Sequence, residues 1–471
     1  MLFSSTTFLF WFLPPVLGLY FLIPRRARTA RNILLLLASL VFYAWGERWF
    51  VLVMLCSIAL NYVLGRLAQT RPRPAVALAA AGNLGLLFVF KYLTFTLRNL
   101  NRLGFGFVIP AIELPIGVSF FTFQALSYVI DVSRGKAKAQ KNPLNVGLYI
   151  SFFPQLIAGP IVKYQTVAEE IEHRQENWAD FSTGASRFLL GLAKKVLLSN
   201  QLALAADAAF DRAGELSAAM AWLGAVCYSL QIFFDFSGYS DMAIGLGRMF
   251  GFHFLENFNY PYLSRTVTEF WRRWHISLST WFRDYIYFPL GGSRVKSRLR
   301  LVFNLFVVWL ATGIWHGANW TFILWGVLYG VAVTVEKLTD LPGWAARHKV
   351  FAAFYRIFTL LLVVLCWMLF RSDSIAAAGR YLMDLFCLGE GACLWSAEAG
   401  LYLRENLVIL CFALLACAPT ATALREKLAR RSAALAALWD ALAAAATVAL
   451  FLVSVSFLVK GTYNPFIYFN F

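Results

Sequence analysis

The feature that most constrains this chain is a series of long apolar stretches that contain no charged residue. These stretches run over Thr6–Pro24, Asn32–Gly46, Phe50–Gly65, Pro74–Phe90 and Asn304–Val335. In lipid every backbone polar group must be satisfied within the chain, so such stretches cross a membrane as helices of about 20 residues. Only 14% of the 471 residues are charged, too few to cover a soluble core. We therefore predict an all-α, polytopic membrane protein with about eleven transmembrane helices, plus re-entrant and interfacial helices.

Basic residues gather in short segments between the apolar stretches and predict how the chain is oriented. A net charge of +17 would suggest a nucleic-acid partner in a soluble protein, but here the positive-inside rule explains it. The basic clusters are Arg25, Arg26, Arg28 and Arg31; Arg66, Arg71 and Arg73; Lys136, Lys138 and Lys141; and Arg425, Lys427, Arg430 and Arg431. With these clusters in the cytoplasm, both termini are expected on the extracytoplasmic side. Met1–Pro24 has no basic leader, so it is expected to stay as the first span.

The chain is expected to form one integral membrane domain, 1–471, in three zones. Residues 1–95 predict peripheral helices that lack buried ionisable groups. Residues 104–335 predict the core that carries the chemistry. Residues 351–471 predict closing helices that end in an extracytoplasmic tail.

Three segments of the core differ from simple spans. Prolines and glycines interrupt Gly104–Gln165, which predicts broken helices around a cavity. Glu169–Lys195 is expected to be a charged, amphipathic connector. In Arg265–Arg300, tryptophan and tyrosine alternate with arginine, which is typical of a helix at the cytoplasmic headgroup level.

His316 is the main candidate for catalysis, because it is one of only five histidines and lies in an uncharged stretch. Burial there favours the neutral imidazole, which can accept a proton as a general base must. Gly317 and Ala318 follow the ring, and Gly313 precedes it, which would leave room for a substrate. The alternative is a histidine that only hydrogen-bonds between packed helices.

Several other polar residues allow both a functional and a structural interpretation. His275 is a second candidate, or else an interfacial residue that packs on tryptophan. Asp235 and Asp241 interrupt apolar sequence. They could orient a histidine, but they are expected instead to pair with an arginine of the Arg265–Arg294 segment or to cap a helix that begins after Gly238. The aromatic tail that contains Tyr468 is either a membrane anchor or a nucleophile that accepts an acyl group. Neither a metal site nor a bound cofactor is expected from the spacing of ligands, and no phosphate-binding loop is present.

Four separated motifs occur together in one order along the chain. They are Leu114–Gln124 (LPIGVSFFTFQ), Phe153–Ile161 (FPQLIAGPI), Trp271–Trp281 and Trp315-His316-Gly317, followed by the tail Phe466–Phe471. In this combination the sequence resembles the membrane-bound O-acyltransferase family. It is most similar to the bacterial branch that includes alginate O-acetyltransferase membrane subunits and teichoic-acid D-alanyl transfer proteins.

The resemblance implies a ring of helices around a central funnel and a reaction that crosses the bacterial cytoplasmic (inner) membrane. It implies that His316 matches the family's invariant histidine, His275 its second histidine, and Tyr468 a candidate acyl relay. Residues expected to bind substrate lie in these motifs or, for Asn319, two residues after the last one: Asn319, Trp315, Trp274, Arg273 and Gln155. Asn319 is also expected to stabilise an oxyanion.

The function expected from the resemblance is transfer of an acyl group, most simply acetyl, from a cytoplasmic thioester to an exported polysaccharide such as alginate. The donor is expected to be acetyl-CoA or an acylated carrier protein, used as a co-substrate. An extracytoplasmic acyltransferase is the expected partner. Transfer of D-alanyl groups, or acyl transfer to peptidoglycan, is the alternative acyltransferase reading. A polysaccharide or lipid-linked sugar transporter is the alternative of another class, although the internal repeats typical of transporters are missing.

Overall fold

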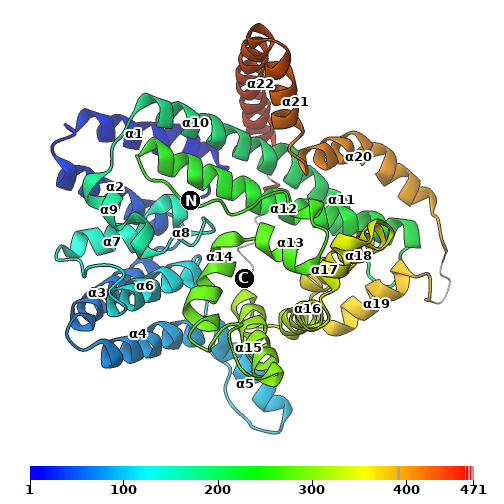
Figure 1. Ribbon diagram of the computed structural model, residues 1–471, viewed down its shortest axis with the longest axis horizontal. Coiled ribbons are helices and arrows are strands. Elements are labelled where there is room, and N and C mark those ends of the chain that lie inside the picture. The colour runs from blue at the N-terminus through cyan, green and yellow to red at the C-terminus, as the bar shows by residue number, and fades with distance from the viewer. Residues whose placement is uncertain (390–392, 462, 465–466, 468–471) are drawn as a thin grey trace. The chain divides into compact units, whose positions relative to one another are not determined.

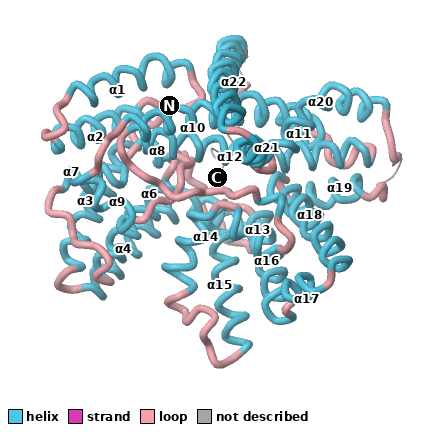
Figure 2. The backbone as a smooth tube through the Cα atoms, turned by 45° about the horizontal axis from the view of Figure 1, so that its top comes forward, coloured by secondary structure: helices cyan, strands magenta, loops and turns pink. Residues whose placement is uncertain are grey.

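The computed structural model describes the whole chain except residues 390–392, 462, 465–466 and 468–471. Within the described residues the secondary structure is entirely helical, as Figure 2 shows by its helices and connecting loops. The predicted all-α class is confirmed. The chain divides into two compact units, unit 1 with Met1–Phe188 and Tyr239–Leu255, and unit 2 with Leu189–Gly238 and Glu256–Phe471. The predicted single domain in three zones, with a central funnel, stays a prediction.

Among the described residues, nine helices are long and apolar enough to cross a membrane. They are Phe50–Ala68, Pro72–Arg102, Trp178–Phe210, Ala218–Met249, Arg298–His316, Trp320–Thr339, Lys349–Arg371, Ala397–Ala416 and Ala433–Lys460. Two shorter apolar helices cover Thr7–Leu22 and Val118–Ser133. The protein is therefore a multi-pass membrane protein, while the predicted count of about eleven crossings stays a prediction.

Unit 1 is built from the N-terminal helices and the end of α12. Its helices are α1 (Leu13–Leu22), α2 (Arg28–Ala44), α3 (Phe50–Ala68), α4 (Pro72–Leu87), α5 (Leu93–Arg102), α6 (Val118–Ser133), α7 (Pro143–Ser151), α8 (Phe153–Leu156), α9 (Tyr164–His173) and most of α10 (Trp178–Ala193). Helix α6 is buried along nearly its whole length. It begins after Gly117, whose φ of 77° and missing Cβ let the Leu156 carbonyl approach closely. The short α6, α7 and α8 confirm the predicted broken helices.

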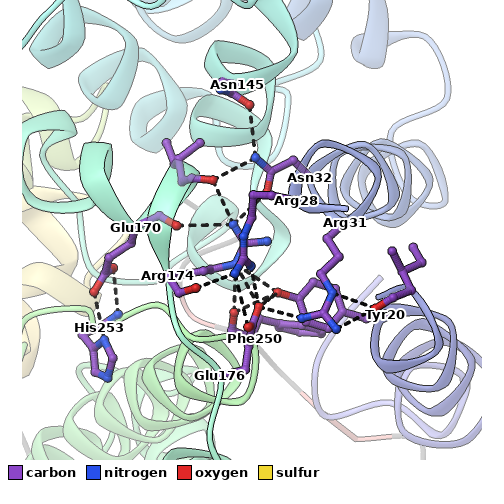
Figure 3. A network of polar contacts seen from close by, with 12 residues as sticks. Tyr20, Arg28, Arg31, Asn32, Asn145, Glu170, Arg174, Glu176, Phe250 and His253 are labelled. Atoms are coloured by element: carbon purple, nitrogen blue, oxygen red, sulfur yellow. Dashed lines mark hydrogen bonds and ion pairs between the residues drawn. The ribbon is translucent and has the colours of Figure 1, made fainter. Parts of the chain in front are cut away.

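A network of polar residues in unit 1 joins Arg28 and Arg31, at the start of α2, to Arg174 and Glu176, after α9 (Figure 3). At its centre, Glu176 accepts hydrogen bonds from Tyr20 and Arg28, both at 2.5 Å, and pairs with Arg31 at 3.0 Å. Arg174 donates from Nε to the Tyr20 hydroxyl at 3.0 Å. Burial alone would raise the pKa of Glu176, but the hydrogen bonds from Arg28 and Tyr20 and the charges of Arg28 and Arg31 outweigh it. The pKa falls to about 2.

The network corrects the prediction that the first 95 residues lack buried ionisable groups. Arg31 is 2% exposed and Lys91 is 8% exposed, and Lys91 donates to the Ser119 hydroxyl at 3.1 Å. Buried charges of this kind are stable only with partners. Here Glu176 pairs with Arg31 and Ser119 accepts from Lys91, and both partners lie more than 25 residues away, which hydropathy does not report.

Unit 2 contains the remaining helices and most of α12. They are the π-helical turn η3 (Lys194–Ser199), α11 (Asn200–Phe210), α12 (Ala218–Met249), α13 (Val267–Arg273), α14 (Ile276–Phe282), α15 (Arg298–His316), α16 (Trp320–Thr339), α17 (Leu341–Arg347), α18 (Lys349–Arg371), α19 (Ile375–Leu385), α20 (Ala397–Ala416), α21 (Thr420–Arg431) and α22 (Ala433–Lys460). Helices α21 and α22 lie side by side, joined by an ion pair of 2.6 Å between Arg425 and Asp440 (Figure 1).

Two predictions about this part of the chain are wrong. The segment Glu169–Lys195 is not a connector, because Trp178–Phe210 forms one of the candidate spans. Within the most apolar window of this helix, 61% of the residues are buried inside the protein. No helix begins after Gly238, because α12 passes through it without a break. A Cβ on Gly238 would lie 2.8 Å from the Gly191 carbonyl oxygen, so this glycine serves close helix packing and not a helix end.

Candidate active site

His316 is the last residue of α15 and is held among aromatic rings in unit 2. His316 is only 4% exposed. Its ring centroid is 5.1 Å from that of Trp315, 5.0 Å from that of Trp325 and 5.2 Å from that of Phe370, each in edge-to-face geometry. Such contacts fix the plane of the imidazole and exclude bulk water from it. The predicted shelter of His316 is therefore confirmed, although its catalytic role stays a prediction.

The glycines around His316 were expected to leave room for a substrate, but in the structure they allow close packing of helices. Cβ atoms added at Gly313 and Gly326 would lie 2.6 Å from the carbonyl oxygens of Phe322 and Trp309. A Cβ on Gly317 would lie 2.3 Å from a ring carbon of Phe322. These glycines let α15 and α16 approach closely, and the partner helix fills the space that the sequence left open for a substrate.

His275 lies at the break between α13 and α14 and is fully buried. Its φ of 44° places it in the left-handed region, which interrupts the helix at this residue. The Asn257 side-chain oxygen accepts the backbone N–H of Ser277 at 3.2 Å and also lies 3.2 Å from His275 Nδ1. Since that oxygen is an acceptor, His275 Nδ1 must carry the proton, and Nε2 keeps its lone pair.

The electrostatic setting of His275 also favours a neutral base. Burial, followed by the nearby His316, lowers the pKa of His275 well below its ordinary value. Nε2 has no hydrogen-bond partner among the described residues. The Trp315 ring centroid is 6.1 Å from that of His275 and 5.1 Å from that of His316. The structure thus brings both predicted histidines to the same tryptophan.

The break at His275 corrects the prediction for Arg265–Arg300. This segment is not one interfacial helix, since α13 and α14 are short helices and their tryptophans are buried in unit 2. Trp271 is 8% exposed, Trp274 2% and Trp281 3%. The rings of Trp271 and Trp274 pack in the apolar core cluster of unit 2, and the ring of Trp281 packs against Phe282 and Tyr285.

The predicted substrate-binding residues of unit 2 differ in their position relative to the two histidines. Trp315 is buried beside both histidines, as described above. The Trp274 ring packs against that of Trp367 in a tilted arrangement, with centroids 4.7 Å apart, in the cluster that also contains Trp325. Arg273 forms an ion pair of 2.9 Å with Glu269 and keeps a third of its side chain exposed. Only Trp315 therefore touches the two histidines.

The other predicted residues have structural contacts of their own. The Asn319 side chain accepts from the backbone N–H of Thr321 as the N-cap of α16, and donates to the Asp373 carbonyl at 2.8 Å. Gln155 belongs to unit 1, where it donates to the Tyr149 carbonyl at 2.5 Å. Tyr468 lies outside the described residues. The binding and relay roles of these three residues stay predictions.

Unit 2 contains a cavity of about 410 Å³ that is lined by near neighbours of the two histidines and not by the histidines themselves. Its lining includes Thr312, one helical turn before His316 on α15, and Ile276, which directly follows His275. Residues four positions apart lie on one face of a helix, so the cavity borders the face that carries His316. The sequence prediction of a cavity placed it in Gly104–Gln165, where that prediction remains untested.

The walls of the cavity are mostly apolar, with a group of cations. Arg272, Arg283 and Lys337 line it, and Arg283 is paired with Asp284 at 3.1 Å. Neither Arg272 nor Lys337 has a carboxylate partner among the described residues. Apolar walls with such cations suit a long aliphatic arm that ends in phosphate.

Comparison with known proteins decides the family. The model of the membrane-bound O-acyltransferase family matches residues 116–370, which is more than half of the chain and includes both histidines. The chain belongs to this family. It is therefore a membrane-embedded O-acyltransferase, and the resemblance predicted from the four motifs is confirmed.

Curated relatives of this O-acyltransferase cover most of its length. The probable alginate O-acetylase AlgI of Pseudomonas aeruginosa is 44% identical over 400 residues, which are 83% of this chain and 75% of the relative. The protein of the same name from Azotobacter vinelandii is 43% identical over 401 residues, 83% of this chain and 79% of the relative. The peptidoglycan O-acetyltransferase of Helicobacter pylori is 35% identical over 448 residues, 87% of this chain and 85% of the relative.

The C-terminal tail of the O-acyltransferase is held by protein contacts that the sequence did not predict. The Tyr463 hydroxyl donates to Asp207, and the Asn200 amide donates to the Asn464 side chain at 3.2 Å. Ile467 is 8% exposed and belongs to the same apolar cluster as Trp274 and Trp325. These described tail residues pack on protein, so a tail that is only a membrane-interface anchor does not fit them.

The polar partners of the tail were visible in the sequence only as isolated carboxylates. Asp235 is paired, as expected, but its partner is Lys195 at 2.5 Å and not an arginine of the Arg265–Arg294 segment. Asp241 pairs with Arg187 at 2.8 Å. The capping part is wrong for both, since both lie inside α12. No signal in the sequence indicated that Lys195 would be the partner, because it stood in the supposed connector.

Proposed function

We propose that this O-acyltransferase transfers acetyl groups from a cytoplasmic thioester to hydroxyl groups of an exported polysaccharide, with alginate as the leading acceptor. The observation that carries the proposal is the identity of 43–44% to alginate O-acetylases over 83% of the chain. The site supports it, because it offers two buried imidazoles and a cavity with apolar walls and cations, whose lining includes Ile276 next to His275 and Thr312 one turn before His316. The setting is the bacterial cytoplasmic membrane, with both termini on the extracytoplasmic side.

The donor reaches the histidines through the cavity. The phosphates of acetyl-CoA, or the phosphate of an acylated carrier protein, pair with Arg272 and Lys337 at the cavity wall. The apolar wall takes the aliphatic arm, which places the thioester near Thr312. Both donors carry the same arm and phosphate, so the site supports the thioester class and leaves the choice to experiment.

The chemical step needs one base and one acceptor hydroxyl. His316 takes the proton of the hydroxyl as its oxygen attacks the thioester carbonyl, and a tetrahedral oxyanion forms. The carbon–sulfur bond then breaks, the acetyl group stays on the oxygen as an ester, and the imidazolium returns its proton to the leaving thiolate. His275, neutral and close to the same tryptophan, supplies a second proton acceptor or orients the donor. The side-chain amide of Asn319 is the proposed oxyanion donor.

In this proposal the first acceptor is the phenol of Tyr468, which carries the acetyl group to an extracytoplasmic acyltransferase partner. The support is that Ile467, the residue before Tyr468, is bound within unit 2, in the apolar cluster that also contains Trp274 and Trp325. The partner then transfers the acetyl group from the tyrosine ester to a sugar hydroxyl, which restores the phenol.

The test uses membranes that contain the full chain, radiolabelled acetyl thioester and the extracytoplasmic fraction of the host. Wild-type membranes are expected to label alginate, and His316→Ala at equal abundance is expected to lose at least about a hundredfold of the rate. His348→Ala is the matched control, since that histidine is exposed at the start of α18. Labelled alginate from His316→Ala at the wild-type rate would refute the proposal.

The same assay separates the alternatives. Purified glycan strands of peptidoglycan, offered beside alginate, would be labelled in preference if the Helicobacter relative reflects the acceptor class better. A D-alanyl thioester that outcompetes the acetyl thioester would replace acetyl as the cargo. A transporter would leave every polymer unlabelled in all variants.

A further inference from the structure

A buried ion pair between consecutive helices of unit 2 has a third partner in the C-terminal tail. Lys195, in the turn η3, lies 2.5 Å from one carboxylate oxygen of Asp235 in α12. Their side chains are 2% and 0% exposed. A charge at this depth is stable only when neutralised, and the lysine does this. Gly238 allows the close approach, because a Cβ there would lie 3.2 Å from the Lys195 backbone nitrogen.

The second carboxylate oxygen of Asp235 is used by the tail. The backbone N–H of Ile467 donates to it over 3.0 Å, in a buried setting. Asp235 therefore divides its two oxygens between a cation of the body and an amide of the tail. A hydrogen bond to a charged acceptor in a dry environment is stronger than one to water or to a neutral carbonyl.

The side chain of Ile467 is also held in place, in addition to its backbone N–H. It is 8% exposed within the apolar cluster that contains Trp274, Trp325 and Trp367. Trp325 in turn packs 5.0 Å from His316. The N–H and the side chain of one residue are thus both held, which fixes the path of the backbone just before Tyr468.

We propose that the Lys195–Asp235 ion pair is a clamp that positions the C-terminal tail for acyl transfer. The clamp deepens the proposed function and rests on the role proposed there for the tail. Lys195 and Asp235 are positioning residues: they act through the backbone of Ile467 and touch neither the thioester nor the hydroxyl. Removing the acceptor releases the tail and lowers the turnover of transfer, while the binding of the thioester in its cavity is unchanged.

The decisive variant is the double substitution Lys195→Met/Asp235→Leu. Replacement of a buried ion pair by apolar residues of similar volume commonly preserves folding, whereas removal of one charge alone leaves the other unpaired. The double variant keeps the helix contact but offers no acceptor to the Ile467 N–H. Asp241→Asn is the matched control, because it breaks the ion pair with Arg187 on the same helix α12 and keeps the Asp235 carboxylate that accepts from Ile467.

The first readout is the accessibility of the tail. The thiol introduced by Ile467→Cys is treated with a maleimide in the full-length protein in detergent, and peptide mass spectrometry follows that site separately from the native cysteines. In the wild-type background labelling is expected to be slow. In the Lys195→Met/Asp235→Leu background the labelling rate is expected to rise by about tenfold or more, because the hydrogen bond from the backbone N–H at position 467 to a charged acceptor is lost. With Asp241→Asn the rate is expected to stay at the wild-type value.

The second readout is kinetic, in proteins without the cysteine substitution. The double variant is expected to lose about tenfold or more in kcat for acetyl transfer, with KM for the thioester within about twofold of wild type. Equal labelling rates in the folded double variant and wild type would overturn the clamp. So would a kcat equal to that of Asp241→Asn.

Failure of the proposed function gives a different pattern. If Tyr468→Phe leaves acetyl transfer unchanged, the relay is refuted, while the maleimide rates still decide whether Asp235 holds the tail. If the relay is right, Tyr468→Phe abolishes transfer with the accessibility of the position 467 thiol unchanged, whereas the double variant changes both.

Discussion

Addition of one methyl group between α15 and α16 tests whether their close contact sets the position of His316. In Gly326→Ala the new Cβ would lie 2.6 Å from the Trp309 carbonyl oxygen and 2.9 Å from the Gly313 Cα. Both atoms are backbone, so neither can turn away as a flexible side chain would. The helices must separate until the contact returns to an ordinary van der Waals distance, a movement of roughly half an ångström to one ångström.

The size of the effect follows from this movement. Overpacking of a tight contact costs about 1–3 kcal/mol of stability. His316 ends α15, whereas Trp325, which contacts its ring, directly precedes Gly326 on α16. Separation of the helices therefore moves the imidazole relative to its aromatic support. A misplacement of this size lowers catalysis by about a hundredfold.

The assay compares Gly326→Ala with Gly379→Ala in detergent. A Cβ on Gly379, in α19, meets no atom within 4 Å, so this control is expected to unfold at the wild-type temperature or higher. Gly326→Ala is expected to unfold several degrees lower and to lose most of its kcat for acetyl transfer. Wild-type values of both quantities in Gly326→Ala would refute the argument that this contact positions His316.

Three further predictions address other sites. His275→Asn is expected to fold normally, because Asn accepts a positive φ, but to lose at least about tenfold in kcat; a wild-type kcat would remove His275 from the mechanism. Glu176→Gln is expected to lower the free energy of unfolding by about 3 kcal/mol at pH 7, because Arg28 and Arg31 lose their counter-charge. Since the pKa of Glu176 falls from 4.5 to about 2 on folding, its contribution is complete above pH 4.5 and disappears as the pH falls towards 2. The melting temperatures of wild type and Glu176→Gln should therefore converge between pH 7 and pH 2, and a constant difference would contradict the assignment. Asn319→Ala is expected to cost about 1 kcal/mol through loss of the cap of α16, measured by thermal unfolding; loss of kcat without loss of stability would instead favour the oxyanion role.

The sequence predicted the features that depend on hydropathy alone. Uncharged stretches identified four of the nine candidate spans among the described residues, because a helix in lipid needs only length and apolar side chains. The rarity of histidine in such stretches identified His316, and the four motifs identified the family. Each of these signals is contained in a short stretch of sequence. None of them depends on which other helix packs against that stretch in the folded protein.

The predictions that failed concern how polar residues find partners. Lys195 made the α10 region look like a surface connector, because its partner, Asp235, is 40 positions further along the chain. Gly238 suggested a helix end, although it marks a close helix contact. The glycines around His316 suggested space, which Phe322 fills. In each case the residue type was informative, but the interpretation needed the tertiary neighbour that only the structure supplies.

The Lys195–Asp235 contact also bears on how the protein enters the bilayer during synthesis. The two residues lie in consecutive spans, Trp178–Phe210 and Ala218–Met249, separated only by residues 211–217. A lone charge in the middle of a helix costs about 2.5–3.5 kcal/mol on insertion. Because each charge meets its counterpart as soon as the second span follows the first, the hairpin can leave the translocation machinery as a neutral pair, before the tail that it later binds has been made.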